Sequence, residues 1–312
     1  MPMDAGSMVM ISSLVLSLVV LVLGVVLQRR RTTVGRPLEV LPDEAVPGFE
    51  PLESEAVGGP PPLPSDLASK WWRVPSRLYN LYDLPLVFLL LALYLSPVVM
   101  ELIAGKPEMQ EMSMELAVGT VAIQFFMVAL VTGFVAWRSH PVSWLGLKWR
   151  QWPLVIPISI FGVLFTWGVV ALLDMSGFLD WLSGGDVDEA RQDVVKAFTE
   201  TQDMALLAML AFLAVVVAPL SEEVLFRGYL YPVCKRFMGR WAGVIFSSLV
   251  FAAVHNNAQA LIPLFVLAIL LTLAYEWTGS IWAPIGMHTL FNGMTVLAQM
   301  AIRFEWIEAP TP

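Results

Sequence analysis

Two adjacent glutamates, Glu222 and Glu223, lie inside an otherwise apolar run of the sequence and are followed by Arg227. Ionisable side chains are costly in hydrocarbon, so groups of this kind mark a candidate functional site. Glu223 and Arg227 are four residues apart and share one helix face, where they can form an ion pair. Glu222 is rotated by about 100° from Glu223 and is free to face another partner.

Two later apolar runs carry histidines. His255 lies in the first of them, and His288 lies in the second, four residues before Asn292. That spacing lets His288 and Asn292 point to one spot. At 1.5 Å per residue, these groups and Glu222 fall about 10–20 Å from the ends of their segments that we assign to the cytoplasmic side. A common depth for polar groups from three segments predicts one site.

The residue types suggest hydrolytic chemistry. A carboxylate and an imidazole beside one water molecule can activate it as a nucleophile, as Glu222 and His255 would. His288 and Asn292 could stabilise an oxyanion through hydrogen bonds. Glu222, His255 and His288 could instead bind Zn²⁺ and leave an open position for water. Ser221 neighbours the glutamates but has no histidine at a fixed local spacing, so it is a weaker nucleophile candidate.

Each group also has a purely structural interpretation. Glu223 with Arg227 could be a buried ion pair, and His288 with Asn292 could join two helices through a hydrogen bond. His255 alone could be a hydrogen-bonded core histidine. All of these costly groups would then have to converge by accident, so the sequence favours a functional site.

The composition is that of a membrane protein. Of the 312 residues, 57% are hydrophobic and only 14% are charged, whereas soluble domains average about 25% charged residues. The net charge of -8 argues against nucleic-acid binding, which requires a basic patch. Because Cys234 is the single cysteine, an intramolecular disulfide is excluded.

The hydropathy pattern predicts an all-α polytopic membrane protein of about eight transmembrane helices. The apolar segments lie near residues 8–28, 84–104, 114–137, 153–173, 204–231, 242–258, 260–277 and 281–302. We expect three parts: an N-terminal transmembrane anchor at 1–32, a Pro-rich acidic linker at 33–69, and a domain at 70–312 that holds the polar groups.

The distribution of Lys and Arg predicts the orientation. With the N-terminus outside, 13 of the 18 Lys and Arg residues fall on the cytoplasmic side, four fall outside, and Arg227 is in the membrane. Cytoplasmic loops carry an excess of positive charge. We therefore expect the N-terminus outside, with the linker and the opening of the site on the cytoplasmic side.

Three short stretches resemble the motifs of the CPBP family, which contains the type II CAAX prenyl endopeptidases and the bacteriocin-processing or Abi proteins. They are EEVLFR at 222–227, FAAVH at 251–255 and HTLFN at 288–292. The family pattern is EExxxR, then FxxxH, then HxxxN or HxxxD. The resemblance covers about residues 150–302 and implies a CPBP-type helical core, to which the hydropathy pattern adds an extra N-terminal anchor helix.

The resemblance implies an intramembrane endopeptidase. Glu222 would activate water, His255 would be its partner, and His288 and Asn292 would stabilise the oxyanion or join a metal site. The implied substrate is a peptide or a membrane protein in the lipid bilayer, with a lipidated CAAX tail as one option.

Other implications and alternatives stay open. Glu223 and Arg227 match supporting positions of the motif. Family members are called metalloproteases, yet a metal-free glutamate mechanism is also proposed for them, so Zn²⁺ on Glu222, His255 and His288 is one of two options. A non-catalytic membrane scaffold or immunity-type protein is an alternative function, and a transporter is a weaker one.

Overall fold

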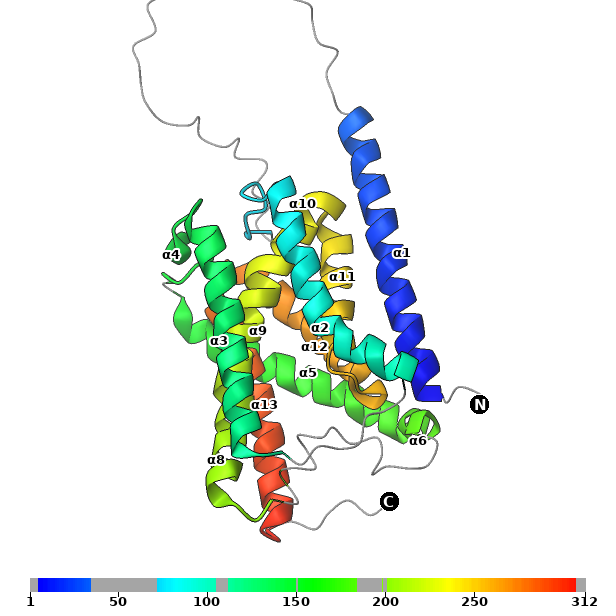
Figure 1. The fold of residues 1–312 in the computed structure, drawn as a ribbon, viewed down its shortest axis with the longest axis vertical. Coiled ribbons are helices and arrows are strands. Elements are labelled where there is room, and N and C mark those ends of the chain that lie inside the picture. Colours follow the sequence, from blue (N-terminus) through cyan, green and yellow to red (C-terminus); the bar gives the residue numbers. More distant parts are fainter. Residues whose placement is uncertain are drawn as a thin grey trace, which may run out of the picture.

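The fold is built entirely of helices in the part of the chain that the structure describes (Figure 1). The structure is a computed structural model that describes residues 5–34, 72–104, 112–149, 151–183, 198 and 201–306. It confirms the predicted all-α class. The linker predicted at 33–69 lies outside the described residues, apart from its first two residues, which end a helix.

The described elements follow one another in a simple order. They are α1 (Ala5–Val34), η1 (Leu81–Asp83), α2 (Leu84–Ala104), α3 (Met114–Ala136), α4 (Pro141–Trp144), η2 (Trp152–Leu154), α5 (Val155–Met175), α6 (Phe178–Ser183), α8 (Met204–Phe212), η3 (Leu213–Val217), α9 (Ala218–Glu222), η4 (Glu223–Leu230), α10 (Tyr231–Met238), α11 (Arg240–Ala253), α12 (Ala258–Thr278) and α13 (Trp282–Arg303). The short elements η1 and η2 are 3₁₀-helical, whereas η3 and η4 are π-helical.

Six helical stretches among the described residues are long and apolar enough to cross a membrane. They are Met8–Arg29, Leu81–Ala104, Met114–Ala136, Trp152–Met175, Met204–Met238 and Ala258–Thr278. The two other predicted spans are also helices, but α11 has only 14 residues, and α13 carries the polar side chains of His288, Asn292 and Gln299. The chain is an integral multi-pass membrane protein.

Both glutamates lie in the long helical stretch Met204–Met238, which is interrupted by π-helical turns on either side of α9. The N–H of Ala218 bonds to the carbonyl of Leu213, and the N–H of Tyr231 bonds to that of Phe226, five residues back in each case. Such π-bulges occur frequently at functional sites. They change which way the intervening side chains point.

The helix predicted as an anchor, α1, packs along α10 and α11 (Figure 1). A narrow stripe that includes Met10, Ser13 and Ser17 is buried on this face. At Gly24, an added Cβ would come within 2.9 Å of the Cβ atoms of Ala242 and Met238. In lipid, helices associate through van der Waals packing at small residues. Gly24 therefore allows a close approach of α1 to the helices that follow the glutamates.

Candidate active site

Glu223 is fully buried and links two helices. Its Oε1 accepts hydrogen bonds from Arg227 Nη1 at 2.9 Å and from His288 Nδ1, on α13, at 2.8 Å. Because a carboxylate oxygen only accepts, Nδ1 of His288 carries the proton, and Nε2 is the ring nitrogen that faces away. The predicted Glu223–Arg227 pair is confirmed, and the contact with His288 adds a fixed orientation of the imidazole.

The charge of Arg227 is compensated inside the protein. Its side chain is only 2% exposed. Nη2 donates to the carbonyl of Ala268 at 3.2 Å, and the guanidinium lies 4.4 Å from the ring centroid of Phe251. Breaking a buried ion pair on one side costs about 3–5 kcal/mol. Arg227 and Glu223 therefore stabilise each other and, through Glu223, the position of His288.

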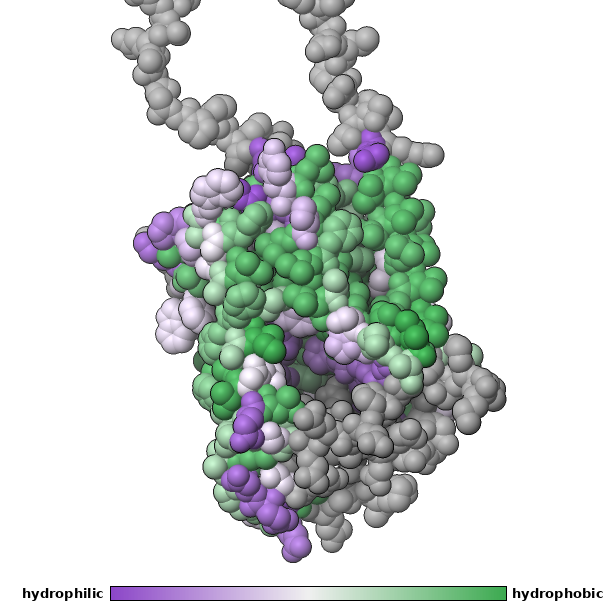
Figure 2. All heavy atoms as spheres, in the orientation of Figure 1, coloured by the Kyte–Doolittle hydropathy of each residue, from purple (hydrophilic) through white to green (hydrophobic). Residues whose placement is uncertain are grey.

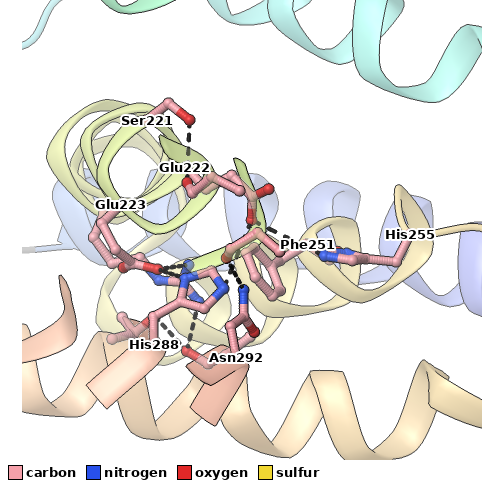
Figure 3. A network of polar contacts seen from close by, with 12 residues as sticks. Ser221, Glu222, Glu223, Phe251, His255, His288 and Asn292 are labelled. Carbon is pink, nitrogen blue, oxygen red and sulfur yellow. Dashed lines mark hydrogen bonds and ion pairs between the residues drawn. The ribbon is translucent and has the colours of Figure 1, made fainter. Parts of the chain in front are cut away.

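Glu222 faces the two imidazoles without touching them. Its Oε2 lies 4.0 Å from Nε2 of His255 and 4.0 Å from Nε2 of His288. This oxygen is buried and has no hydrogen-bond partner in the described residues. One water molecule at about 2.8 Å from each atom can bridge a gap of this size. The carboxylate and both imidazoles thus converge on a place for one small polar group (Figure 3).

His255 has its ring orientation set by its own helix. Nδ1 lies 2.7 Å from the carbonyl of Phe251, and because a carbonyl only accepts, Nδ1 is the donor. In the neutral ring, Nε2 keeps its lone pair and faces Glu222. The sequence predicted a helical span over 242–258, but α11 ends at Ala253. His255 therefore lies in the turn after α11 and not within a helix. Asn256, at φ 49°, reverses the chain toward α12.

Asn292 joins α13 to the first π-helical turn. Its Nδ2 donates to the carbonyl of Ala214 at 2.9 Å. In the π-helical register of η3, the N–H five residues later donates to each carbonyl. For Ala214 that residue is Pro219, which has no N–H. One of the two amide hydrogens of Asn292 is therefore engaged, and its predicted oxyanion role stays a prediction.

Gln124, on α3, contacts the residue next to the glutamates, although this helix was not predicted to contribute to the site. Ser221 Oγ lies 2.7 Å from Oε1 of Gln124, on α3, and 2.8 Å from the carbonyl of Val217. The single hydroxyl proton of Ser221 is taken up by these acceptors, which disfavours a nucleophilic role. An amide in the middle of the apolar segment 114–137 is a signal by which the sequence could have indicated Gln124.

The polar side chains of the candidate site differ in access to solvent. The side chains of Glu222 and His255 are 16% and 24% exposed, whereas that of His288 is 3% exposed. Figure 2 shows a hollow with hydrophilic residues near mid-height, between α3 and the lower part of α2. Glu222 and His255 are thus the groups of the site that a substrate can reach, while Glu223, Arg227 and His288 lie behind them.

The arrangement does not form a ready zinc site. Two ligands of a tetrahedral zinc at about 2.0–2.1 Å are about 3.4 Å apart, whereas Glu222 Oε2 is 4.0 Å from each histidine nitrogen. Among the described residues, no group of three or more His, Cys, Asp and Glu side chains is placed to hold a metal ion. Zinc on Glu222, His255 and His288 stays a prediction.

Comparison with known proteins finds a family model that matches the segment holding this site. Residues 204–294 match the family described as type II CAAX prenyl endopeptidase Rce1-like. The chain is 34% identical over 95 residues to the membrane-embedded CAAX protease MroQ of Staphylococcus aureus (strain USA300), which covers 28% of this chain and 38% of MroQ.

Two further relatives have no described function. The uncharacterized protein YpbD of Bacillus subtilis (strain 168) is 34% identical over 100 residues, 31% of this chain and 47% of YpbD. An uncharacterized 24.3 kDa protein of Escherichia coli is 29% identical over 153 residues, 46% of this chain and 68% of that protein. The matches thus span less than half the length of MroQ and YpbD. No solved structure matches the chain.

The matched segment contains every residue of the candidate site, namely Glu222, Glu223, Arg227, His255, His288 and Asn292. The resemblance found in the three short motifs and the match of the whole segment agree. Residues 204–294 therefore form an Rce1-like domain, and this domain is similar to the type II CAAX prenyl endopeptidases of the CPBP family.

Proposed function

We propose that this protein is an intramembrane endopeptidase in which Glu222 and His255 activate a water molecule. The observation that carries the proposal is the convergence of a buried, unpartnered carboxylate oxygen and two oriented imidazoles, each 4.0 Å from that oxygen. The membership of residues 204–294 in a peptidase family supports the same conclusion.

The nucleophile follows from the hydrogen-bonding capacities of the two groups. Ionised Glu222 accepts only, and Nε2 of neutral His255 accepts as well. A water molecule between them donates one hydrogen to each, which directs an oxygen lone pair outward to the substrate. As this oxygen bonds to the peptide carbonyl carbon, its proton passes to Glu222 or His255. The same group then delivers that proton to the leaving nitrogen as the C–N bond breaks.

His288 is placed to donate a hydrogen bond to the oxyanion. Glu223 accepts from Nδ1 at 2.8 Å, which fixes the orientation of the ring. When Nε2 carries a proton, it can donate to the oxyanion of the tetrahedral intermediate. The second amide hydrogen of Asn292 could add a further donor. The buried Arg227 offsets the charge of Glu223, which limits the accumulation of negative charge beside the oxyanion.

The substrate class is proposed from the family. A peptide or a membrane protein is the substrate that an endopeptidase in a bilayer would take, and a prenylated CAAX tail is the first probe to test. A reporter set would hold quenched-fluorescent peptides with and without a prenylated C-terminal CAAX sequence. Mass spectrometry of the products would locate the cleaved bond.

The test uses purified protein in detergent or liposomes. We expect cleavage by the wild type and by Glu115→Gln, which changes an exposed carboxylate at the start of α3. We expect no cleavage by Glu222→Gln or His255→Ala, although both insert and fold. Activity in both variants would refute the site assignment, and absence of cleavage by the folded wild type would favour the non-catalytic scaffold.

Chelation separates the two proposed mechanisms. If zinc is not required, activity persists after dialysis against a strong chelator, and metal analysis of the active protein shows no stoichiometric zinc. Loss of activity that added Zn²⁺ restores would show that the histidines and Glu222 close around a metal, contrary to the metal-free mechanism described above.

A further inference from the structure

The backbone carbonyl of Gly228, in η4, cannot accept the hydrogen bond that an α-helix would give it. The donor in an α-helix would be Pro232, four residues later, which has no N–H. Two side chains from distant parts of the chain take its place. Tyr79 Oη donates to this carbonyl at 2.9 Å, and Trp144 Nε1 donates to it at 2.8 Å. Trp144 Nε1 is also 2.7 Å from Tyr79 Oη, so the three groups form a triangle.

This contact is buried and closely fitted. Tyr79 and Trp144 are 1% and 3% exposed, and an unpaired carbonyl in such a place would be costly. A Cβ added at Gly228 would lie 2.8 Å from Cδ2 of Leu145, so the absence of a side chain allows the close approach. Burial raises the pKa of Tyr79 above its ordinary value, so the phenol keeps the proton that it donates.

The next residue extends the same attachment. Tyr229 Oη donates to Oδ1 of Asp83 at 3.1 Å. Asp83 is fully buried and accepts two hydrogen bonds from Arg138, at 2.6 and 2.9 Å. The C-terminal end of η4 is thus held from outside the helix, while Glu223 lies at its N-terminal end.

A π-helical turn depends on such contacts because its geometry is less favourable than that of an α-helix. If η4 relaxed to an α-helix, its two halves would shift relative to each other by one residue, which is about 100° around the axis. Glu223 could not then face His288 while Tyr229 faced Asp83. The register of η4 therefore determines whether the site is assembled.

We propose that Tyr79 and Trp144 are positioning residues of the site, which hold the Gly228 carbonyl and so keep η4 in the register that aims Glu223 at His288. Neither side chain contacts Glu222, His255 or His288, so neither is a catalytic residue. The kinetic consequence rests on the proposed function, whereas the geometric consequence at His288 does not.

Three variants test the proposal: Tyr79→Phe, Trp144→Phe and the double variant. Each single change leaves one side-chain donor on the carbonyl, and the double change removes both. Tyr82→Phe and Trp137→Phe are matched controls, because these residues are 80% and 85% exposed. We expect kcat for a reporter peptide to fall roughly tenfold or less in each single variant and on the order of 10²-fold in the double variant, with KM unchanged.

A spectroscopic readout makes the test independent of activity. The chain has three histidines, His140, His255 and His288, so protein labelled with ¹⁵N-histidine gives three imidazole signal sets. Assignment of the His288 set by a His288→Gln variant identifies the Nδ1 proton that bonds to Glu223. We expect this signal to shift in both single variants, to shift further or vanish in the double variant, and to be unchanged in both controls.

The outcomes separate the two proposals. An unchanged His288 signal in the folded double variant overturns the positioning role, whatever the activity. If the double variant does not fold, Tyr79→Phe decides, because a His288 signal no different from that of Tyr82→Phe also overturns the role. A wild type that cleaves no reporter refutes the proposed function alone, since the His288 signal still reports the geometry.

Discussion

At the scale of single residues, the two adjacent carboxylates have different surroundings. Glu223 accepts from Arg227 and His288 and is fully buried, whereas Oε2 of Glu222 has no partner and faces the two histidines across 4.0 Å. Oε2 of Glu223 also lacks a hydrogen-bond partner in the described residues, but its Oε1 takes part in a buried ion pair, and breaking such a pair is costly. The two glutamates should therefore respond in opposite ways to neutralisation.

Neutralisation of each glutamate to glutamine tests this difference. Glu223→Gln leaves Arg227 as a buried, unpaired charge, so we expect a loss of about 3–5 kcal/mol in the free energy of unfolding. Glu222→Gln should leave stability unchanged within about 0.5 kcal/mol or raise it, because Oε2 of Glu222 makes no hydrogen bond to the described residues. Thermal unfolding followed by tryptophan fluorescence measures both. Equal destabilisation by the two changes would contradict the assignment of Glu223 as support and Glu222 as the reactive group.

At the scale of elements, the prolines of the Met204–Met238 stretch each free a carbonyl near the glutamates. Pro219 leaves the Ala214 carbonyl to Asn292 in the π-helical register. Pro232 removes the α-helical donor of the Gly228 carbonyl, which accepts from side chains before η1 and in α4. Proline in a helix removes one donor, and partners on neighbouring helices satisfy the freed group in membranes. These contacts attach the helix of the glutamates to its neighbours on both sides of the site.

The Asn292 contact allows a double-mutant test. Asn292→Leu leaves the Ala214 carbonyl without a donor, so we expect a loss of about 1–3 kcal/mol in the free energy of unfolding. Pro219→Ala restores a backbone N–H, so the same Asn292→Leu change should cost less in that background. If Asn292→Leu lowers the free energy of unfolding equally with and without Pro219, the proline is not the reason why the Ala214 carbonyl accepts from Asn292.

The elements also show what the sequence could and could not predict. Spacing in an α-helix predicted the Glu223–Arg227 pair, and similar depths predicted that Glu222, His255 and His288 lie near one another. The contact between Glu223 and His288 was not predictable, because η4 is π-helical and its hydrogen bonds span five residues instead of four. The partners of Gly228 lie far away in the sequence, at Tyr79 and Trp144, so no local pattern could indicate them.

At the scale of the whole molecule, the ends of the described helices lie on two opposite sides. Figure 1 shows α4, α10 and the C-terminal end of α1 at one end, and α6 with the N-terminal end of α1 at the other. The ion pairs Asp83–Arg138 and Glu276–Lys235 belong to the first end, because Arg138 lies just before α4 and Lys235 lies in α10. This arrangement agrees with the predicted grouping of Lys and Arg, while the sidedness itself stays a prediction.

Cysteine labelling tests the orientation in intact cells. The native Cys234 is free and buried, so Cys234→Ala provides a background for single cysteines. A membrane-impermeant maleimide should label Met175→Cys, at the exposed end of α5, and should label His140→Cys only after permeabilisation. The reverse pattern would place the N-terminus in the cytoplasm and invert the predicted topology.

The measurement that tests the central claim most directly is the rate at which Glu222→Gln cleaves a peptide that the wild type cleaves. This change keeps the shape of the side chain and removes the carboxylate that would take the proton of water. We predict a fall in kcat of about 10²–10⁴-fold, with the unfolding temperature retained and with Glu115→Gln as active as the wild type. A Glu222→Gln variant that folds and cleaves within a few fold of the wild-type rate would contradict the account.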